Sequence, residues 1–197
     1  MLESMIHNPR PTRAEASDVA NAIFDSTDAI MLSAETAIGQ YPVNAVQMME
    51  RIAAATEPAL PYQKHMTETL LGASEGITDA VSQATCEIAY ELSAKAIVPA
   101  SASGYTARMI ARHRPATPIL VVTPSEQVCR RLALVWGVQA QLSPDAQTTD
   151  EIIAGAERAA LDAGLAGPGD LLIITAGIPL GVRGKTNMLK AHVICTT

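Results

Sequence analysis

Short apolar runs alternate with stretches of helical periodicity from residue 75 onward. The apolar runs predict strands at 96–98, 119–122, 138–142, 171–175 and 189–194. Helices are expected between them, at 78–92, 105–112, 126–135 and 149–163. Because alternation of strand and helix is typical of parallel pairing, we predict a three-layer α/β/α domain with a mostly parallel sheet of about five strands.

Two of these elements carry more specific expectations. The last strand follows a turn-rich segment, so we expect it to run antiparallel to its neighbour. In the helix at 78–92 the apolar side chains share one side, which we expect to face the core: Ala80, Val81, Ala84, Ile88, Ala89 and Leu92.

Residues 1–60 predict a helix, a strand and a second helix. Thr12-Arg13-Ala14-Glu15 is a capping box that begins the first helix, and the second helix is expected from about residue 43 to residue 56. Between them, the apolar run at 29–32 is bounded by polar and turn residues, which indicates a buried strand. A (β/α)₈ barrel needs roughly 250 residues, so one strand with two helices would leave its flanks uncovered. We therefore expect further sequence to complete this unit.

A connecting segment separates the two parts of the chain. Pro61 and Gly72 disfavour regular structure, and residues around them predict an interdomain connection. We therefore divide the chain into a first unit at 1–60, a linker at 61–74 and an α/β domain at 75–197.

Polar side chains directly follow the strand expected at 29–32. Ser33, Glu35 and Thr36 lie where α/β barrels and open α/β sheets place their chemistry, past the carboxyl end of a strand. They are therefore candidates for contact with a ligand. Spacing alone favours a different role, in which Ser33 or Thr36 caps a short helix and Glu35 lies in its first turn.

A second polar loop, at 101–106, follows a strand and begins a helix. Its hydroxyl groups and its glycine, together with free helix N–H groups, could hold a phosphate, and the residues concerned are Ser101, Ser103, Gly104 and Thr106. The sequence alone favours ordinary capping by Ser103, with Gly104 supplying the tight turn.

Composition and charge restrict the function. Hydrophobic residues make up 48% of the 197 residues, the net charge is −6 and no long basic run occurs, which argues against nucleic acid as the main partner. No eighteen-residue apolar run and no signal peptide is visible, so we expect neither a membrane span nor export. Three dispersed cysteines fit buried reduced thiols in a cytoplasmic protein. The four histidines form no metal-like cluster, and we expect most of them near the surface.

Several segments of the first fifty residues together resemble one family closely. They are Met1-Leu2-Glu3-Ser4-Met5-Ile6, Asn8-Pro9-Arg10-Pro11-Thr12-Arg13-Ala14-Glu15, Asp18-Val19-Ala20-Asn21-Ala22, the stretch at 28–35 and Tyr41-Pro42. This pattern resembles the end of the catalytic barrel of pyruvate kinase, and the remaining residues resemble, more loosely, the C-terminal domain of that enzyme. The resemblance implies a partial (β/α)₈-barrel segment followed by the α/β domain.

The resemblance also implies roles for individual residues. Ser33 and Glu35 would be secondary residues of the active-site rim. Arg10 and Arg13 would lie in a loop near the active site and a subunit contact, and a surface salt bridge with Glu15 or Asp18 is an equally weighted alternative.

The loop at 101–106 aligns with the sugar-phosphate effector loop of allosteric pyruvate kinases. The resemblance implies that Ser101, Ser103, Gly104 and Thr106 hold a phosphate, and that the glycine-rich segment 177–184 closes over it. Arg183 and Lys185 could add positive charge there. That segment lacks the family's Trp-Arg pair at its start, which leaves open whether fructose bisphosphate or a simpler sugar monophosphate binds.

The reaction implied by the resemblance is phosphoryl transfer from phosphoenolpyruvate to ADP, with Mg²⁺ and K⁺, in a homotetramer. The family's phosphoryl-stabilising lysine and its metal ligands belong to earlier barrel strands, which this sequence does not contain. Because phosphoryl transfer needs that cationic stabilisation, we expect this chain to bind neither metal and to be inactive alone. The alternative function is a free-standing regulatory module that binds a phosphorylated metabolite without catalysis.

Overall fold

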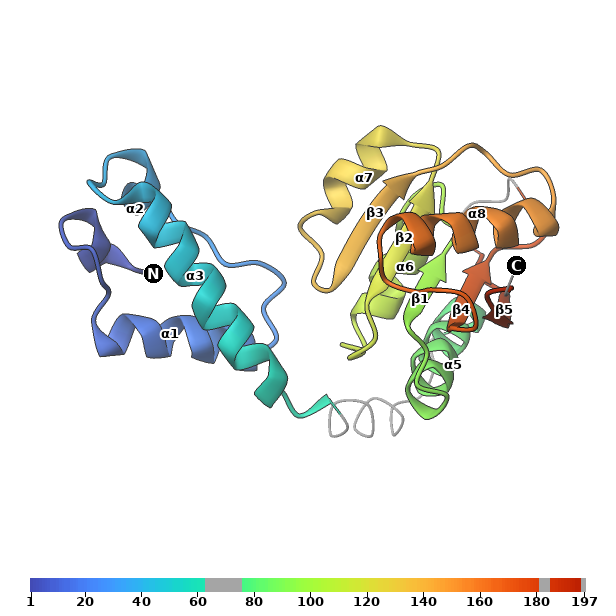
Figure 1. Cartoon of the computed structure of the whole chain (residues 1–197), viewed down its shortest axis with the longest axis horizontal. Helices are drawn as coiled ribbons and strands as arrows, with labels where there is room; N and C mark the ends of the chain where they lie inside the picture. Colours follow the sequence, from blue (N-terminus) through green and yellow to red (C-terminus); the bar gives the residue numbers. More distant parts are fainter. Residues whose placement is uncertain (63–75, 181–184, 196–197) are drawn as a thin grey trace. The chain divides into compact units, whose positions relative to one another are not determined.

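The chain forms two compact units, Met1–Pro61 and Tyr62–Thr197, which are described separately here. The structure is a computed structural model that describes residues 1–62, 76–180 and 185–195 (Figure 1). The linker expected at 61–74 lies, from residue 63 onward, outside the described residues.

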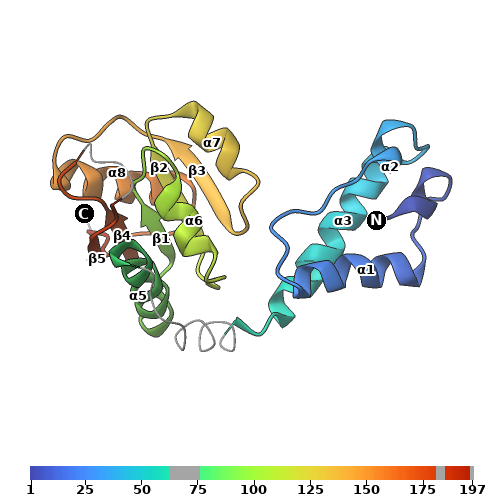
Figure 2. The same cartoon turned by 180° about the vertical axis from the view of Figure 1, so that it is seen from behind.

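The first unit is helical within its described residues. It contains η1 (Glu3–Ile6), α1 (Arg13–Phe24), α2 (Ala34–Ala37), α3 (Pro42–Thr56) and η2 (Glu57–Ala59). α1 packs against α3 (Figures 1 and 2) around a small core of six buried side chains. They are Leu2, Met5, Val19, Ile23, Ala45 and Met49.

The predicted capping box at the start of α1 is confirmed. Thr12 Oγ1 accepts a hydrogen bond from Glu15 N–H at 3.3 Å, and the Glu15 carboxylate accepts one from Thr12 N–H at 2.7 Å. The same carboxylate also accepts bonds from the backbone and hydroxyl of Ser4, at 2.7 and 2.5 Å. Burial acts to raise the pKa of Glu15, but the bonds from Ser4 and Thr12 lower it to about 2.

The buried strand predicted at 29–32 is wrong. These residues have no regular secondary structure, and the Met31 side chain is 75% exposed. A strand needs a neighbour that pairs its backbone N–H and C=O groups, and no other strand lies among the described residues of Met1–Pro61. The apolar run at 29–32 would therefore form a buried strand only if a second strand lay beside it.

The second unit is built on the predicted five-stranded sheet, in the order β3-β2-β1-β4-β5. Its strands are β1 (Ala96–Pro99), β2 (Ile119–Thr123), β3 (Val138–Leu142), β4 (Leu171–Ala176) and β5 (Met188–Val193). The first four are parallel to their neighbours, and β5 pairs antiparallel with β4, as predicted. The α/β fold class is therefore confirmed.

Helices cover both faces of this sheet, which gives the predicted three layers. α8 (Thr149–Asp162) packs on one face, with Ile152 and Ala156 against Leu120 and Ile174. On the other face lie α5 (Ile77–Glu91), α6 (Tyr105–Ala111) and α7 (Glu126–Leu132). Figures 1 and 2, seen from opposite sides, show α8 and then α5 with α6 in front of the strands.

The ladder between β1 and β2 is interrupted at the end of β1. Ile97 N–H donates to the carbonyl of Pro118 at 2.9 Å, and Ser101 N–H donates to that of Val122 at 3.1 Å. Pro99 lies between these two positions and has no N–H to donate. The β1–β2 pairing is accordingly short, with a separate bridge from Ala100 to Val122.

The inward face predicted for the helix at 78–92 is right at Ala89, which is buried, and at Ile88, which packs against the core, but wrong at Ala80 and Leu92. The buried residues of α5 are Asp79, Ser82, Thr85, Cys86 and Ala89, whereas Ala80 and Leu92 are exposed. The Ser82 and Thr85 hydroxyls donate to the carbonyls of Thr78 and Val81, at 2.7 and 2.6 Å. Because each hydroxyl is satisfied within the helix, a polar face can be buried there.

Candidate functional site

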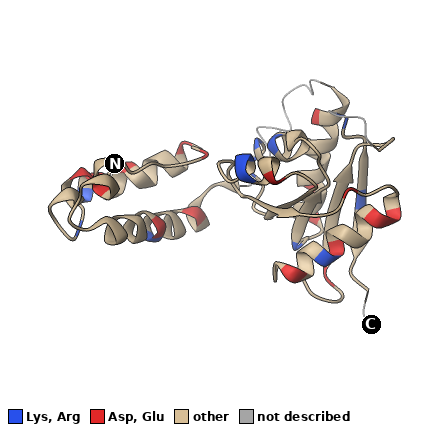
Figure 3. Cartoon of the chain, turned by 90° about the horizontal axis from the view of Figure 1, so that it is seen from above, with Lys and Arg blue, Asp and Glu red and all other residues tan. Residues whose placement is uncertain are grey.

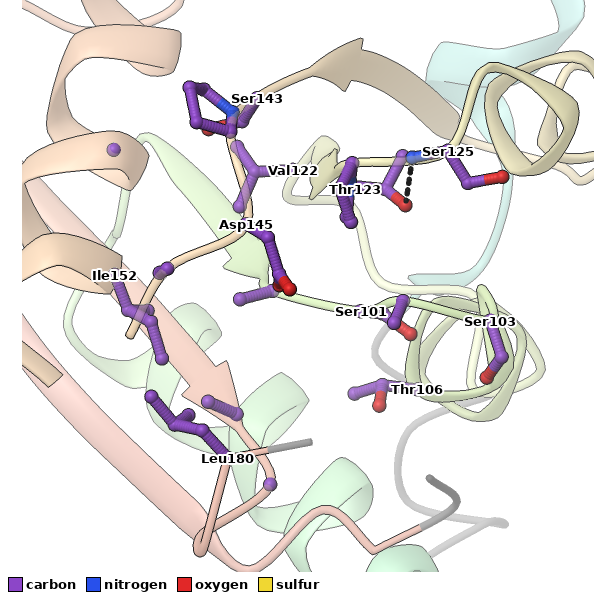
Figure 4. Close-up of a pocket in the computed structure, with 18 of the residues that line it drawn as sticks. Ser101, Ser103, Thr106, Val122, Thr123, Ser125, Ser143, Asp145, Ile152 and Leu180 are labelled. Carbon is purple, nitrogen blue, oxygen red and sulfur yellow. Dashed lines mark hydrogen bonds between the residues drawn. The ribbon is translucent and has the colours of Figure 1, made fainter. Parts of the chain in front are cut away.

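A pocket of about 420 Å³ opens at the carboxyl edge of the parallel strands in the second unit. Its walls come from the loops after β1, β2, β3 and β4 and from the first turns of α8 (Figure 4). The chain runs outward from β1 through β2 to β3 and then returns to place β4 on the other side of β1. Open α/β sheets bind ligands where the strand order reverses in this way, so this is the candidate functional site.

Hydroxyl groups line the wall of the pocket that the loop after β1 provides. Ser101, Ser103 and Thr106 all contribute to it, and Figure 4 shows them grouped around the start of α6. Ser101 Oγ accepts a bond from Gly104 N–H at 3.0 Å, and Ser103 Oγ accepts one from Tyr105 N–H at 3.4 Å. Since both oxygens act as acceptors, their hydrogens remain available to a phosphate oxygen.

Gly104 has a conformational role and does not line the pocket. It is the N-cap of α6 with φ of 73°, a left-handed conformation that favours glycine. A Cβ atom at this position would lie 3.1 Å from side-chain atoms of Leu132 and of Val128 on α7. The alternative is thus right that Gly104 supplies the tight turn, but the N-cap residue of α6 is Gly104 and not Ser103.

Thr106 connects the pocket to the interior. Its side chain is 7% exposed, and its hydroxyl bonds that of Thr186 at 2.6 Å. Thr186, 1% exposed, donates its backbone N–H to Thr78 Oγ1 in the first turn of α5 at 3.2 Å. The loop after β1 is thereby tied to the start of α5.

A charged contact joins the next residue of α5 to the end of α6. The buried Asp79 carboxylate lies 3.2 Å from Arg112 Nη2 and 3.6 Å from His113 Nε2. His113 is 3% exposed and therefore a buried histidine, whereas His7 is exposed, as expected for most of the histidines. Burial lowers the pKa of His113 and so does the charge of Arg112, while Asp79 acts to raise it.

The opposite wall was not singled out from the sequence. It contains Thr123, Ser125, Ser143 and Asp145, which follow β2 and β3, and Figure 4 shows the Asp145 side chain pointing toward the middle of the pocket. The signal was present in Thr123-Pro124-Ser125 and Ser143-Pro144-Asp145, two polar turns placed directly after predicted strands. The rule that indicated the loop at 101–106 applies equally to them.

Of the two positively charged residues expected near this site, the structure describes one. Lys185 lines the pocket, whereas Arg183 lies outside the described residues. Among the residues that the structure describes, no group of three or more His, Cys, Asp or Glu side chains could hold a metal ion. Lys and Arg are interspersed with Asp and Glu in both units (Figure 3).

Ser33 and Glu35 lie at the start of the short helix α2. Ser33 is the N-cap residue of α2 and Glu35 lies in its first turn, as the capping alternative predicted, but the exposed Ser33 side chain makes no capping bond. Glu35 is 3% exposed, and its carboxylate accepts bonds from Ser33 N–H at 2.8 Å, Leu2 N–H at 2.9 Å and the amino terminus at 3.0 Å. Burial acts to raise the pKa of Glu35, but these donors and its own backbone N–H lower it to about 2.

Arg10 and Arg13 are both exposed. The alternative of a salt bridge to Glu15 or Asp18 is wrong, since neither guanidinium pairs with any residue in the described ranges. The Glu15 carboxylate is instead occupied by its bonds to Ser4 and Thr12.

The three cysteines are free and differ in exposure. Cys86 is buried, which raises its pKa to about 12, whereas Cys195 is exposed, contrary to the expectation that all three are buried. None of the helices in the described ranges is long and apolar enough to cross a membrane.

Comparison with known proteins gives two consecutive family matches. Residues 1–46 match "Pyruvate kinase, barrel domain", and residues 79–192 match "Pyruvate kinase, alpha/beta domain". The chain belongs to the pyruvate kinase family. It is 53% identical over 194 residues to pyruvate kinase of Geobacillus stearothermophilus, and 48% identical over 194 residues to that of Clostridium acetobutylicum.

These alignments cover most of this chain but only part of each relative. They include 98% of this chain, with 33% of the Geobacillus stearothermophilus pyruvate kinase and 41% of the Clostridium acetobutylicum enzyme. The chain therefore spans between a third and about two fifths of the length of these relatives.

Proposed function

We propose that this chain is the C-terminal part of a pyruvate kinase, the glycolytic enzyme that transfers a phosphoryl group from phosphoenolpyruvate to ADP, giving pyruvate and ATP. The observation that carries the proposal is the pair of family matches, which follow one another in the order barrel, then α/β domain. Residues 1–60 would end the catalytic barrel, residues 61–74 would link it, and residues 75–197 would form the C-terminal domain.

The first unit would contribute to the active-site rim. The exposed Ser33 hydroxyl is free to meet a ligand, and Glu35 holds the backbone of Ser33 at 2.8 Å, so Glu35 would position the rim. Arg10 and Arg13 would face the active site or a neighbouring subunit, since their charges are not neutralised by described residues. Mg²⁺ and K⁺ would serve the complete enzyme through residues outside this chain.

The pocket of the second unit would be an effector site. Its hydroxyl-lined wall at Ser101, Ser103 and Thr106, with Lys185 nearby, suits a phosphate group. The complete enzyme would be a cytoplasmic homotetramer.

A free-standing regulatory module is the alternative function. Such a module would have no use for a barrel segment, yet residues 1–46 match the barrel domain of the family. We therefore favour the enzyme.

A chimaeric enzyme tests this proposal. The matching segment of the Geobacillus stearothermophilus pyruvate kinase is replaced by this chain, and pyruvate formation from phosphoenolpyruvate and ADP is measured with Mg²⁺ and K⁺. We expect the chimaera to be active and this chain alone to be inactive. Within the chimaera, Ser33→Ala should raise KM for phosphoenolpyruvate, whereas Ser17→Ala on the exposed face of α1 should not. An inactive but folded and tetrameric chimaera, or turnover by the chain alone, would contradict the proposal.

A further inference from the structure

The first turn of α5 holds α6 at both of its ends, and Figure 2 shows the two helices side by side. At the start of α6 the Thr106 hydroxyl bonds that of Thr186, whose backbone N–H donates to Thr78 Oγ1. At the other end Arg112, the C-cap residue, places Nη2 3.2 Å from Asp79 Oδ1. Thr78 and Asp79 are consecutive residues of that turn. One attachment therefore consists of neutral hydroxyl groups and the other of charges.

His113 lies beside the charged attachment. Its Nε2 atom is 3.6 Å from the same Asp79 oxygen, which is too far for a hydrogen bond. Neither ring nitrogen of His113 has a hydrogen-bond partner in the described part of the chain, although the side chain is buried. Such a group is unusual, because a polar atom removed from water normally finds a partner. The imidazole therefore has unused hydrogen-bonding capacity next to a carboxylate.

The surroundings of His113 keep its ring neutral. Burial lowers the pKa of His113 and so does the guanidinium of Arg112, its neighbour in the chain, whereas the Asp79 carboxylate on α5 acts to raise it. Cys86, the thiol of α5 that bonds the Ile110 carbonyl of α6 at 3.8 Å, is also neutral, because burial raises its pKa to about 12. A proton on His113 would therefore bring two cations against one carboxylate.

We propose that His113 is a proton-controlled switch at the end of α6: when the ring takes up a proton, Asp79 exchanges Arg112 for His113 as its cationic partner. The step forms one N–H bond, with the proton supplied by the solvent. The Arg112 side chain is 45% exposed and can return to water, whereas the enclosed imidazolium needs the carboxylate. The hydroxyl attachment at Thr78 does not titrate in this range, so α6 would stay held at its start and be released at Arg112. The exchange does not depend on the effector function proposed above.

Carbon-detected NMR of the arginine side chains in the purified chain tests this switch. A guanidinium held in a salt bridge rotates slowly and gives separate Nη signals, whereas a solvated one gives a single averaged signal. We expect separate Arg112 signals at pH 8 and an averaged signal below the midpoint of the His113 titration, which the Cε1–H signal of His113 reports in the same sample. His113→Asn should keep the Arg112 signals separate at both pH values. Arg131, exposed on α7, is the internal control and should give an averaged signal throughout.

The His113 titration provides a second, independent measurement. Arg112→Gln removes a like charge beside the ring, so it should raise the midpoint by about half a pH unit. Arg131→Gln is the matched control and should leave the midpoint unchanged. An unmoved midpoint in Arg112→Gln would contradict the competition between the two cations, even if His113→Asn did not fold.

Three results of the arginine experiment would overturn the switch. Arg112 signals that stay separate while His113 titrates would show that Asp79 keeps its first partner. Averaging that also occurs in His113→Asn would assign the release of Arg112 to another group. Loss of the folded amide spectrum before His113 titrates would show that the proton unfolds the domain instead of exchanging partners.

Discussion

The hydroxyl oxygens of Thr106 and Thr186 lie 2.6 Å apart in the interior, although 80 positions separate these residues in the sequence. One residue lines the candidate pocket and the other bonds the first turn of α5. The contact therefore joins the pocket to the start of α5.

Replacing either threonine should cost stability. Thr106→Val keeps the shape but leaves the buried Thr186 hydroxyl without its partner, so the free energy of unfolding should fall by about 1–3 kcal/mol. In the double variant Thr106→Val/Thr186→Val the total loss should be smaller than the sum of the two single losses, because no unpaired hydroxyl remains. Chemical denaturation measures the free energy of unfolding of the two single variants and the double variant. Thr149→Val, at an exposed position, is the control. Strict additivity would contradict the pairing.

The conformation of Gly104 predicts a second loss of stability. Gly104→Ala places a Cβ in a left-handed backbone conformation and 3.1 Å from Leu132 and Val128, so unfolding should be easier by about 1–3 kcal/mol. Gly155→Ala is the matched control, because that glycine is inside α8 and its new Cβ would have an ordinary 3.5 Å contact. The control should be neutral or more stable by up to about 1 kcal/mol. Equal effects of the two substitutions on the melting temperature would argue against the strain at Gly104.

Glu35 predicts acid sensitivity of the first unit. A carboxyl group whose pKa drops from 4.5 to about 2 on folding stabilises the fold above its ordinary pKa, and this stabilisation is lost as the pH falls through both values. Between pH 5 and pH 2 the loss should be on the order of 2–3 kcal/mol. Glu35→Gln should remove this contribution and leave the similar one of Glu15, whose pKa is also lowered to about 2, whereas Glu50→Gln on the exposed face of α3 should retain both. Helical circular dichroism against denaturant and pH provides the measurement.

His113 predicts a second, milder pH range of instability. Because its pKa is lowered in the folded chain, the unfolded chain takes up a proton first as the pH falls below about 6.5. The free energy of unfolding should therefore decrease from pH 8 to pH 5. His113→Asn should flatten this slope, and His7→Asn, at an exposed position, should leave it unchanged. A slope that is the same in all three chains would assign the pH dependence to another group.

β1, β2 and β4 could be predicted because each is an apolar run buried on both faces, as Ile97, Val121 and Ile173 illustrate, whereas β3 and β5 are only partly buried. The capping box at Thr12 was equally predictable, since all its bonds lie within four residues. The strand at 29–32 was not, because an apolar run specifies a strand only where another strand pairs with it.

The buried polar face of α5 and one wall of the pocket could not be predicted, because both depend on contacts between segments that are distant in the sequence. Asp79 is buried because Arg112 and His113 meet it from another helix, and a helical pattern cannot show such a partner. The hydroxyl wall at Ser101 and Ser103 could be predicted from one loop. The wall at Asp145 depended on the strand order, which places the ends of β1, β2 and β3 side by side.

Pro99 shortens the hydrogen-bonded pairing between β1 and β2, just before the loop that lines the pocket. Every other pairing in this sheet forms a ladder of four or more paired positions, whereas β1 and β2 are joined on either side of a residue that can donate no hydrogen bond. The loop at 101–106, whose hydroxyls line the pocket, begins immediately after this short pairing. Separating β1 from β2 would therefore break fewer backbone hydrogen bonds than separating any other pair of neighbouring strands in the sheet.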